Sequence, residues 1–207
     1  MLQQALRNGH EVKALVRNPA HAALQSNLSE TDRQQLHLVT GDARDAKAVA
    51  EALDGQDVAI VSLGSTPWAD DKQRKICSEG QAVINEAVAA SPTVKRVIVV
   101  SSLGVNESYK DLSCFTKIFV DWVIWKAIED KNVQEMLVKE KFAQGDKDWV
   151  IVRPGGLNNN PKTEKVKAEE EGIGGGMISR QDVAWYILMH CLQGPENSRK
   201  AKVLINA

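Results

Sequence analysis

Cysteine is scarce in this sequence of 207 residues, and the three cysteines lie far apart at Cys77, Cys114 and Cys191. No two of them have the spacing of zinc ligands, and an odd number argues against a disulfide framework. The four histidines form no His-x-x-x-His pair, so we expect no metal site. We interpret the cysteines as small buried apolar residues in a reducing compartment, which favours a cytoplasmic protein.

Long apolar runs and a surplus of one charge are also missing. No run approaches the roughly 18 consecutive apolar residues of a membrane span, and the N-terminus lacks the basic-then-apolar pattern of a signal peptide. The 26 Lys and Arg residues balance 27 Asp and Glu residues, so no overall field attracts nucleic acid or an anionic membrane. We therefore expect neither of these partners.

Short runs rich in β-branched residues alternate with longer helical stretches. Several runs are apolar on both faces, as buried strands of a parallel sheet are. The predicted strands are Val12 to Val16, Leu36 to Val39, Val58 to Leu63, Val97 to Val100, Trp149 to Val152 and Val203 to Ile205. The predicted helices are Asp45 to Leu53, Asp70 to Ala90, Leu112 to Lys141 in one or two pieces, and Gln181 to Leu192 after a Ser179 cap. The alternation and the length predict one doubly wound α/β domain over residues 1–207.

The segment from Asn158 to Met177 departs from this alternation. It combines an Asn-Asn-Asn-Pro sequence, a charged run and the glycine cluster Gly172 to Gly176. We interpret it as a long mobile loop after a strand, which either borders a ligand site or is simply a solvated surface loop.

Six phrases, in order along nearly the whole chain, carry a family resemblance. They are Gly9 to Val12 with Val16 to Pro19, Gly41 to Asp45, Val61 to Ser65, Lys95 to Gly104, Trp149 to Leu157 and Ile178 to Ala184. Together they resemble the atypical short-chain dehydrogenase/reductase group, an NAD(P)-binding family that includes NmrA-like regulators and flavin-reductase-like enzymes. The resemblance implies a Rossmann-like doubly wound parallel sheet with a dinucleotide at the carboxyl ends of its strands.

The resemblance assigns the adenosine end of the cofactor to the ends of the second and third strands of the family's sheet. Arg17 ends the second strand, where an arginine would face the 2′-phosphate of NADP, and Asn18 follows it. Asp42 and Ala43 follow the third strand, where the family places the adenine. The alternative for Asp42 is a helix cap, a role that Asp45 could also fill.

The resemblance assigns the nicotinamide end to three further strand ends. Leu63, Gly64 and Ser65 end the fourth strand, and a glycine there lets the backbone approach the cofactor. Ser101 and Ser102 end the fifth strand, where the family's serine polarises a substrate carbonyl. The backbone of Pro154, Gly155 and Gly156, after the sixth strand, would contact the carboxamide side.

The catalytic pair Tyr-x-x-x-Lys of short-chain dehydrogenases is missing. Neither tyrosine, Tyr109 or Tyr186, has a lysine four residues later. Lys131 is the best-placed lysine on the long helix, but the tyrosine position is then Ala127, which cannot donate a proton. We interpret Lys131 as a solvated helix residue.

The family's first strand and glycine-rich phosphate turn are missing as well, because Met1 opens directly on the end of a helix. The predicted sheet therefore lacks a central strand and the N–H groups that would hold the pyrophosphate. The two strands beside the gap either pair directly or leave room for another segment. A third alternative is a natural polypeptide longer by roughly 20 residues.

An apolar stripe at helical spacing follows the fifth strand, with Phe115, Ile118, Phe119, Trp122 and Trp125. Core packing is the more frequent reason for such a stripe, and a substrate pocket or a homodimer face are the alternatives.

The sequence leaves three functions open. The first is an NADPH-dependent reductase of a small carbonyl, quinone or flavin-like substrate, which Arg17 and the two serines favour. The second is a non-catalytic NADP-sensing protein, which the missing Tyr-x-x-x-Lys favours. The third is a truncated product that binds no dinucleotide, which the missing phosphate turn favours.

Overall fold

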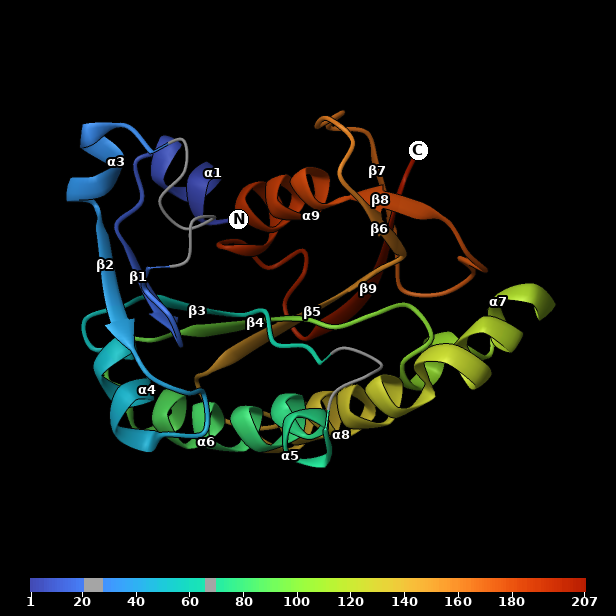
Figure 1. The fold of residues 1–207 in the computed structure, drawn as a ribbon, viewed down its shortest axis with the longest axis horizontal. Helices are drawn as coiled ribbons and strands as arrows, with labels where there is room; N and C mark the ends of the chain where they lie inside the picture. Colours follow the sequence, from blue (N-terminus) through green and yellow to red (C-terminus); the bar gives the residue numbers. More distant parts are fainter. Residues whose placement is uncertain (21–27, 66–69) are drawn as a thin grey trace.

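A computed structural model describes residues 1–20, 28–65 and 70–207, and Figure 1 shows its elements along the chain. The strands are β1 (Val12–Val16), β2 (Leu36–Thr40), β3 (Val58–Val61), β4 (Arg96–Val100), β5 (Asp148–Pro154), β6 (Gly156–Asn158), β7 (Val166–Glu169), β8 (Met177–Ser179) and β9 (Lys200–Asn206). The α-helices are α1 (Leu2–Arg7), α3 (Glu30–Gln34), α4 (Ala46–Leu53), α5 (Asp71–Arg74), α6 (Ile76–Ala90), α7 (Cys114–Phe119), α8 (Trp125–Lys141) and α9 (Arg180–Tyr186). All six predicted strands are present, with ends shifted by a few residues.

The strands form a mainly parallel, Rossmann-like α/β fold, but not one continuous sheet. The largest sheet has the order β3-β4-β5-β9-β7, in which only β7 is antiparallel to its neighbour. β1 and β2 form a separate parallel pair. Among the described residues β1 pairs only with β2, and β3 pairs only with β4. No ladder joins β1 to β3, and no other strand lies between them in the described residues. Direct pairing of the two strands, one of the alternatives from the sequence, is therefore not what this structure shows.

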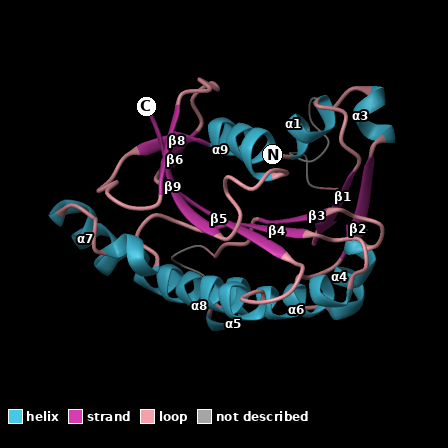
Figure 2. Ribbon diagram, turned by 180° about the vertical axis from the view of Figure 1, so that it is seen from behind, coloured by secondary structure: helices cyan, strands magenta, loops and turns pink. Residues whose placement is uncertain are grey.

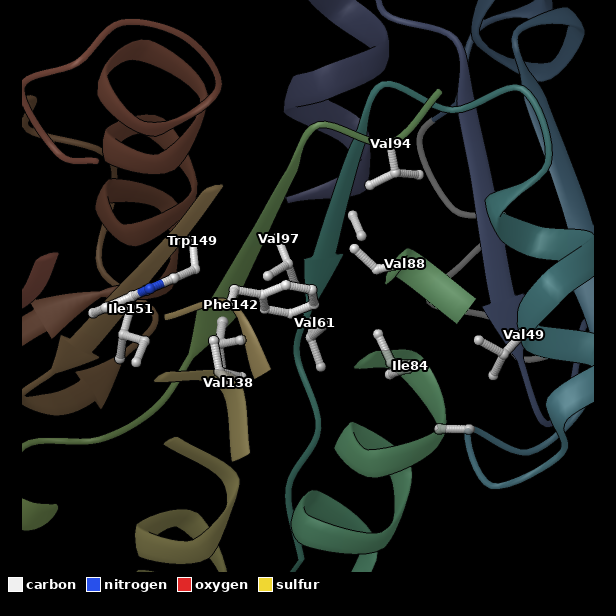
Figure 3. Close-up of a cluster of buried hydrophobic side chains, with 13 residues drawn as sticks. Val49, Val61, Ile84, Val88, Val94, Val97, Val138, Phe142, Trp149 and Ile151 are labelled. Atoms are coloured by element: carbon white, nitrogen blue, oxygen red, sulfur yellow. The ribbon is translucent and has the colours of Figure 1, made fainter. Parts of the chain in front are cut away.

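Helices cover both faces of the large sheet (Figures 1 and 2). α4, α6 and α8 lie on one side, while α9 lies on the other side, beside α1. Successive residues of β4 serve the two faces: Val97 packs into the cluster with α6 and α8, and Ile98 packs into the cluster with α9. Figure 3 shows Val97 facing Phe142, which follows α8. This double burial is the reason that the strand is apolar at every position from Val97 to Val100.

The β1–β2 pair is attached to the rest of the molecule through side chains of α4 and the strands themselves. Val49 of α4 is buried in the same cluster as the α6 residues, and Leu15 of β1 packs against that cluster. Gly41, after β2, allows a close approach, because a Cβ atom there would lie 2.4 Å from the Cβ of Ala48. The pair is therefore held by apolar packing rather than by backbone hydrogen bonds to β3.

Local caps explain where two of the predicted helices begin. The Asp45 carboxylate accepts hydrogen bonds from the N–H groups of Lys47 and Ala48 at 2.9 and 3.3 Å, which starts α4 as expected. The Ser179 hydroxyl accepts from the Asp182 N–H at 2.9 Å and starts α9. Asp45, and not Asp42, is therefore the cap of the helix after β2.

Long-range contacts explain where the other predicted helices break. The stretch from Asp70 to Ala90 divides at Lys75 into α5 and α6. The first turn of α6 is held by Asp130 of α8, whose carboxylate accepts from the N–H groups of Cys77 and Ser78 at 2.8 and 3.0 Å. The long tract from Leu112 to Lys141 divides into α7, a π-helical turn over Val120–Ile124 and α8.

The segment from Asn158 to Met177 is more ordered than the loop predicted from the sequence. β7 lies inside it and pairs with β9, and its two ends form the parallel pair β6–β8. The buried Asp182 carboxylate fixes its middle, accepting from the N–H groups of Thr163 and Glu164 at 2.8 and 2.9 Å. The prediction of a structureless loop was therefore wrong, because its partners lie elsewhere in the chain.

Exposure corrects two further predictions. Cys77 and Cys191 are buried as expected, but Cys114 is exposed. Four of the five residues of the predicted stripe are exposed to solvent and do not pack into the core, namely Phe115, Ile118, Trp122 and Trp125. The side chain of Phe119 lies outside the described part of the structure. Across the described ranges, no helix combines the length and the apolar character needed to cross a membrane.

Candidate functional site

The carboxyl ends of three adjacent parallel strands bring the predicted nicotinamide-side residues together. β3 ends before Leu63 and Gly64, β4 ends before Ser101, and β5 ends at Pro154. The backbone beyond β4 stays paired with β5: the Ser101 N–H donates to the Val152 carbonyl at 2.7 Å. These residues therefore form one continuous rim, the position at which open α/β sheets bind ligands.

Lys131 of α8 is the side chain that reaches this rim. Its Nζ donates hydrogen bonds to the carbonyl oxygens of Leu63 and Val100, at 3.1 and 3.0 Å, and so bridges the ends of β3 and β4. Burial lowers the pKa of Lys131, while the nearby Cys77 opposes that shift. The prediction of a solvated lysine was wrong, because the rotation of α8 turns this residue toward the sheet.

The two serines after β4 have different environments. The Ser102 hydroxyl is half-buried and donates to the Leu103 carbonyl at 3.1 Å. The Ser101 hydroxyl is buried and has no hydrogen-bond partner among the described residues. A buried hydroxyl without a partner costs about 1–3 kcal/mol, so a ligand or water is expected to satisfy it. Ser101 directly follows Val100, whose carbonyl binds Lys131.

A buried ionic network, which the sequence did not reveal, holds the loop after β4. The Arg153 guanidinium of β5 donates to the Glu135 carboxylate at 2.9 and 2.6 Å and to Glu107 at 2.5 Å. Although burial raises the pKa of Glu107, hydrogen bonds from Lys139 and Arg153 hold it near 2. The Asn106 N–H, at a φ of 46°, donates to the Asn132 side chain of α8 at 2.8 Å. The loop is thereby fixed to both β5 and α8. The signal for this network in the sequence was an arginine directly after the apolar run Trp149 to Val152.

The predicted adenosine-side residues lie at the ends of β1 and β2. Arg17 is exposed and close enough to Asp42 for its charge to lower the pKa of that carboxyl group. Asp42 is not free, because Arg44 binds it through Nε at 2.8 Å and Nη2 at 2.9 Å. This hydrogen-bonded ion pair lowers the pKa of Asp42 to about 2. Asn18 stabilises its own turn by accepting from the Ala20 N–H at 3.0 Å, and His21 lies outside the described residues.

Ala43 and Leu63 connect the two halves of the site through α6. A Cβ atom on Gly80 would lie 2.8 Å from the Leu63 Cδ1 and 3.1 Å from the Ala43 Cβ, so both side chains pack against this glycine. The residues predicted for the adenosine side and for the nicotinamide side therefore meet over α6, although their strands share no ladder in the described structure.

The three glycines that were predicted to contact the cofactor differ in their surroundings. Gly155 and Gly156 lie against the backbone of Gly176, whose carbonyl accepts the Gly156 N–H at 2.8 Å. A Cβ atom on Gly155 would lie 2.4 Å from that carbonyl oxygen, so a close chain crossing alone requires this glycine. Gly64, in contrast, is exposed, and a Cβ atom there would meet no atom of the described residues within 4 Å. Gly64 and the half-buried Ser65 therefore offer backbone that a ligand can approach.

The chemistry of these donors fits a nicotinamide dinucleotide at its two ends. Arg17 offers an exposed guanidinium, which suits a phosphate, and the rim offers the Ser101 hydroxyl and the Lys131 ammonium. Between the two ends, the first N–H groups of α6 are already bound by Asp130. α6 therefore does not present an open N-terminus to a pyrophosphate.

A hollow of about 500 Å³ lies elsewhere, between α1 and α3. Its lining includes Gly9, just before β1, and Gln35, just before β2, so it opens at the amino ends of these strands. None of the predicted site residues lines it, and it is separate from the rim.

Comparison with known proteins agrees with this geometry. A family model described as NAD(P)H-binding matches residues 1–194. The reductase PytE of Aspergillus terreus is 25% identical over an aligned length of 237. The alignment covers 97% of this chain and 89% of the relative. YhfK of Bacillus subtilis (strain 168), described as an uncharacterised sugar epimerase, is 30% identical over 176 residues, which cover 84% of this chain and 73% of the relative.

A solved structure shows the same likeness in three dimensions. ChuY, an anaerobilin reductase from Escherichia coli O157:H7, superposes with a TM-score of 0.76 at 25% sequence identity. The superposition covers 99% of this chain and 89% of the other, so the likeness extends over the whole fold.

Proposed function

Because the chain belongs to the NAD(P)H-binding family, we propose that it is a reductase that uses NADPH to reduce a small carbonyl, quinone or flavin-like substrate. The observation that carries the proposal is the buried Ser101 hydroxyl without a described partner, beside the strand ends that Lys131 bridges. Two of the similar proteins, PytE and ChuY, are named reductases, which supports the same reaction class.

The residues of the rim suit the electrostatic part of such a reduction. When bound, a nicotinamide cofactor would supply the hydride for the acceptor, and the residues of the rim would serve the acceptor atom that gains charge and takes up a proton. The Ser101 hydroxyl would donate a hydrogen bond to that atom. Lys131 uses two of its three ammonium hydrogens on the strand ends, and the third would stabilise the developing negative charge. Its lowered pKa makes it a readier proton donor than an exposed lysine.

The preference for NADPH is proposed from Arg17. Its exposed guanidinium follows β1, where the 2′-phosphate of NADP would lie if the cofactor spans the rim. The neighbouring Arg44 is neutralised by Asp42 and Glu79, so Arg17 is the cation that supports this role.

Substitution of Lys131 tests the catalytic part of the proposal. We expect Lys131→Met and Ser101→Ala each to lower kcat/KM with a quinone or flavin acceptor by about tenfold to a hundredfold, because stabilisation of the transition-state charge is lost. Oxidation of NADPH, followed by absorbance, measures the rate, and calorimetry with NADPH measures binding separately.

Lys147→Met is the matched control. Lys147 also donates from Nζ to two backbone carbonyls, those of Ser91 and Val94 at 2.6 and 2.7 Å, but before the amino end of β5. It should lose stability as Lys131→Met does, while its kcat/KM stays near that of the parent. An equal loss of activity in both variants would show that Lys131 acts only through the fold.

A non-catalytic NADP-binding protein is the second candidate, and Ala127 favours it. Ala127 stands four residues before Lys131, where a tyrosine donor would be needed. This candidate predicts calorimetric binding of NADPH without oxidation in the presence of any acceptor of the panel. If the titration shows no binding of either NADPH or NADH, both candidates are wrong and the chain is a fold without a cofactor.

A further inference from the structure

An exposed apolar ridge lies on the helical tract that follows β4. We define it as Phe115, Ile118, Trp122 and Trp125, which are 87, 60, 84 and 44% exposed. Phe115 and Ile118 lie on α7, Trp122 on the π-helical turn and Trp125 at the start of α8, so the ridge crosses all three pieces of this tract. The ridge continues along α8 through Val133 and Met136, which are also exposed.

The ridge lies away from the residues that serve the fold and the rim. The buried residues of α8 are Ile128, Asp130, Gln134, Glu135 and Val138, and they face the sheet and α6. Val133 lies two positions after Lys131, about 200° around the helix, so it points away from the strand ends. Figures 1 and 2 both place α7 at the end of the molecule opposite the β1–β2 pair.

The size of the ridge points to a protein partner. Three large aromatic side chains, an isoleucine and the two α8 residues expose on the order of 700 Å² of apolar surface, because each aromatic residue alone carries roughly 200 Å². The largest apolar patch on a monomer is typically about 300–600 Å², and a stable dimer buries about 800 Å² per partner. The ridge therefore has nearly the area that one side of a dimer requires.

The charges beside the ridge favour a second copy over a membrane. Lys117 and Lys126 are matched by Asp121 and Glu129 within the same tract. Asp121 accepts the Tyr109 hydroxyl, and Lys117 lies over the same ring at 5.5 Å from its centre. Because positive and negative charges beside the ridge are equal in number, the same surface of a second copy can pack against it across a two-fold axis. Binding to an anionic membrane would instead require an excess of basic residues.

We infer that this protein forms a symmetric homodimer in which the ridges of two copies pack against each other. Trp122 is the most exposed tryptophan of the ridge and is expected to be the main anchor, because tryptophan is enriched among the residues that carry most of the binding energy of interfaces. The interface lies on the outer side of α7 and α8 and leaves the rim accessible in each copy.

Sedimentation equilibrium of the purified chain between about 1 and 100 μM tests the inference. We expect a monomer–dimer equilibrium in the parent and a dissociation constant raised at least about thirtyfold in Trp122→Glu and in Phe115→Glu. The matched control is Met189→Glu, since Met189 is an exposed apolar residue on the opposite face of the sheet and outside the ridge. Its dimerisation should equal that of the parent, and the far-ultraviolet circular dichroism of all variants should be unchanged.

Three results would overturn the inference. The first is a parent that stays monomeric over the whole concentration range. The second is a dimer that persists in the double variant Phe115→Glu/Trp122→Glu. The third is a parent monomer that co-sediments with vesicles of phosphatidylcholine and phosphatidylserine, because the ridge would then be a lipid-binding surface.

Discussion

At the scale of single residues, Asp182 connects segments that lie far apart in the chain. It accepts hydrogen bonds from the backbone of Thr163 and Glu164 and from the side chains of Ser179 and Asn206, the last at 2.6 Å. Burial raises the pKa of Asp182, but these donors outweigh burial and lower it from 3.8 to about 2. The carboxylate therefore ties the β6–β7 segment and β9 to the start of α9.

This environment predicts a pH-dependent contribution to stability. Because the folded pKa lies below the unfolded value, the contribution is complete above about pH 4 and is lost as the pH falls through about 2. A shift of this size corresponds to about 2 kcal/mol. Urea unfolding of the parent and of Asp182→Asn should show a stability difference that narrows between these pH values. A difference that is constant down to pH 2 would contradict the assignment.

Arg17 gives a second prediction at this scale. Arg17→Ala should weaken NADPH binding about tenfold to a hundredfold, because a charge-assisted contact to phosphate is lost, and it should affect NADH much less. Arg17→Lys keeps the charge but not the planar fork, so an intermediate affinity is expected. Calorimetric titration of both cofactors measures the effect. Equal losses for NADPH and NADH would remove Arg17 from the 2′-phosphate site.

Residues at strand ends were predictable from the sequence, but their environments were not. Ser101 and Gly64 follow apolar runs directly, so their place at the rim follows from local pattern. The burial of Lys131 depends on the rotation of α8 against the sheet, and the pairing of Asp42 with Arg44 depends on a turn geometry that spacing does not encode. For this reason candidate site residues could be named from the sequence, while the contacts of each side chain could not.

At the scale of elements, caps decide which predicted boundaries were correct. α4 begins where its neighbouring residue Asp45 caps it, so a local signal was sufficient. The break before α6 depends on Asp130, which is more than fifty residues away, and β7 depends on pairing with β9. Contacts between residues so far apart in the sequence cannot be recognised from a short window of it.

The close approach of β2 and α4 gives a prediction for this scale. Gly41→Ala should destabilise the protein by about 1–3 kcal/mol, because the new methyl group would lie 2.4 Å from the Ala48 Cβ, which cannot move without its helix. Gly64→Ala is the matched control, since within residues 1–20, 28–65 and 70–207 no atom lies within 4 Å of its added Cβ. Chemical denaturation measures both. Similar stabilities for the two variants would show that α4 is free to shift away from β2.

At the scale of the whole molecule, the division of the sheet predicts unequal stability. β4 has paired neighbours on both edges and three fully buried residues, Val97, Ile98 and Val99, whereas β1 is half-buried and pairs along one edge in the described structure. Amide hydrogens of β1 should therefore exchange with deuterium faster than those of β4. Hydrogen–deuterium exchange with mass spectrometry measures this difference. Equal protection of β1 and β4 would mean that the two sheets open as one unit.

The edge of β3 that lacks a paired strand in the part of the chain described also affects how the protein behaves when it is concentrated or heated. β1 carries Lys13, whose ammonium is bound to the Asp54 carbonyl at 2.6 Å and places a charge on that strand. The four residues of β3, Val-Ala-Ile-Val, contain no charge, proline or glycine. Such a segment can add a strand from another molecule once its cover loosens. Aggregation of this protein is therefore expected to begin at β3.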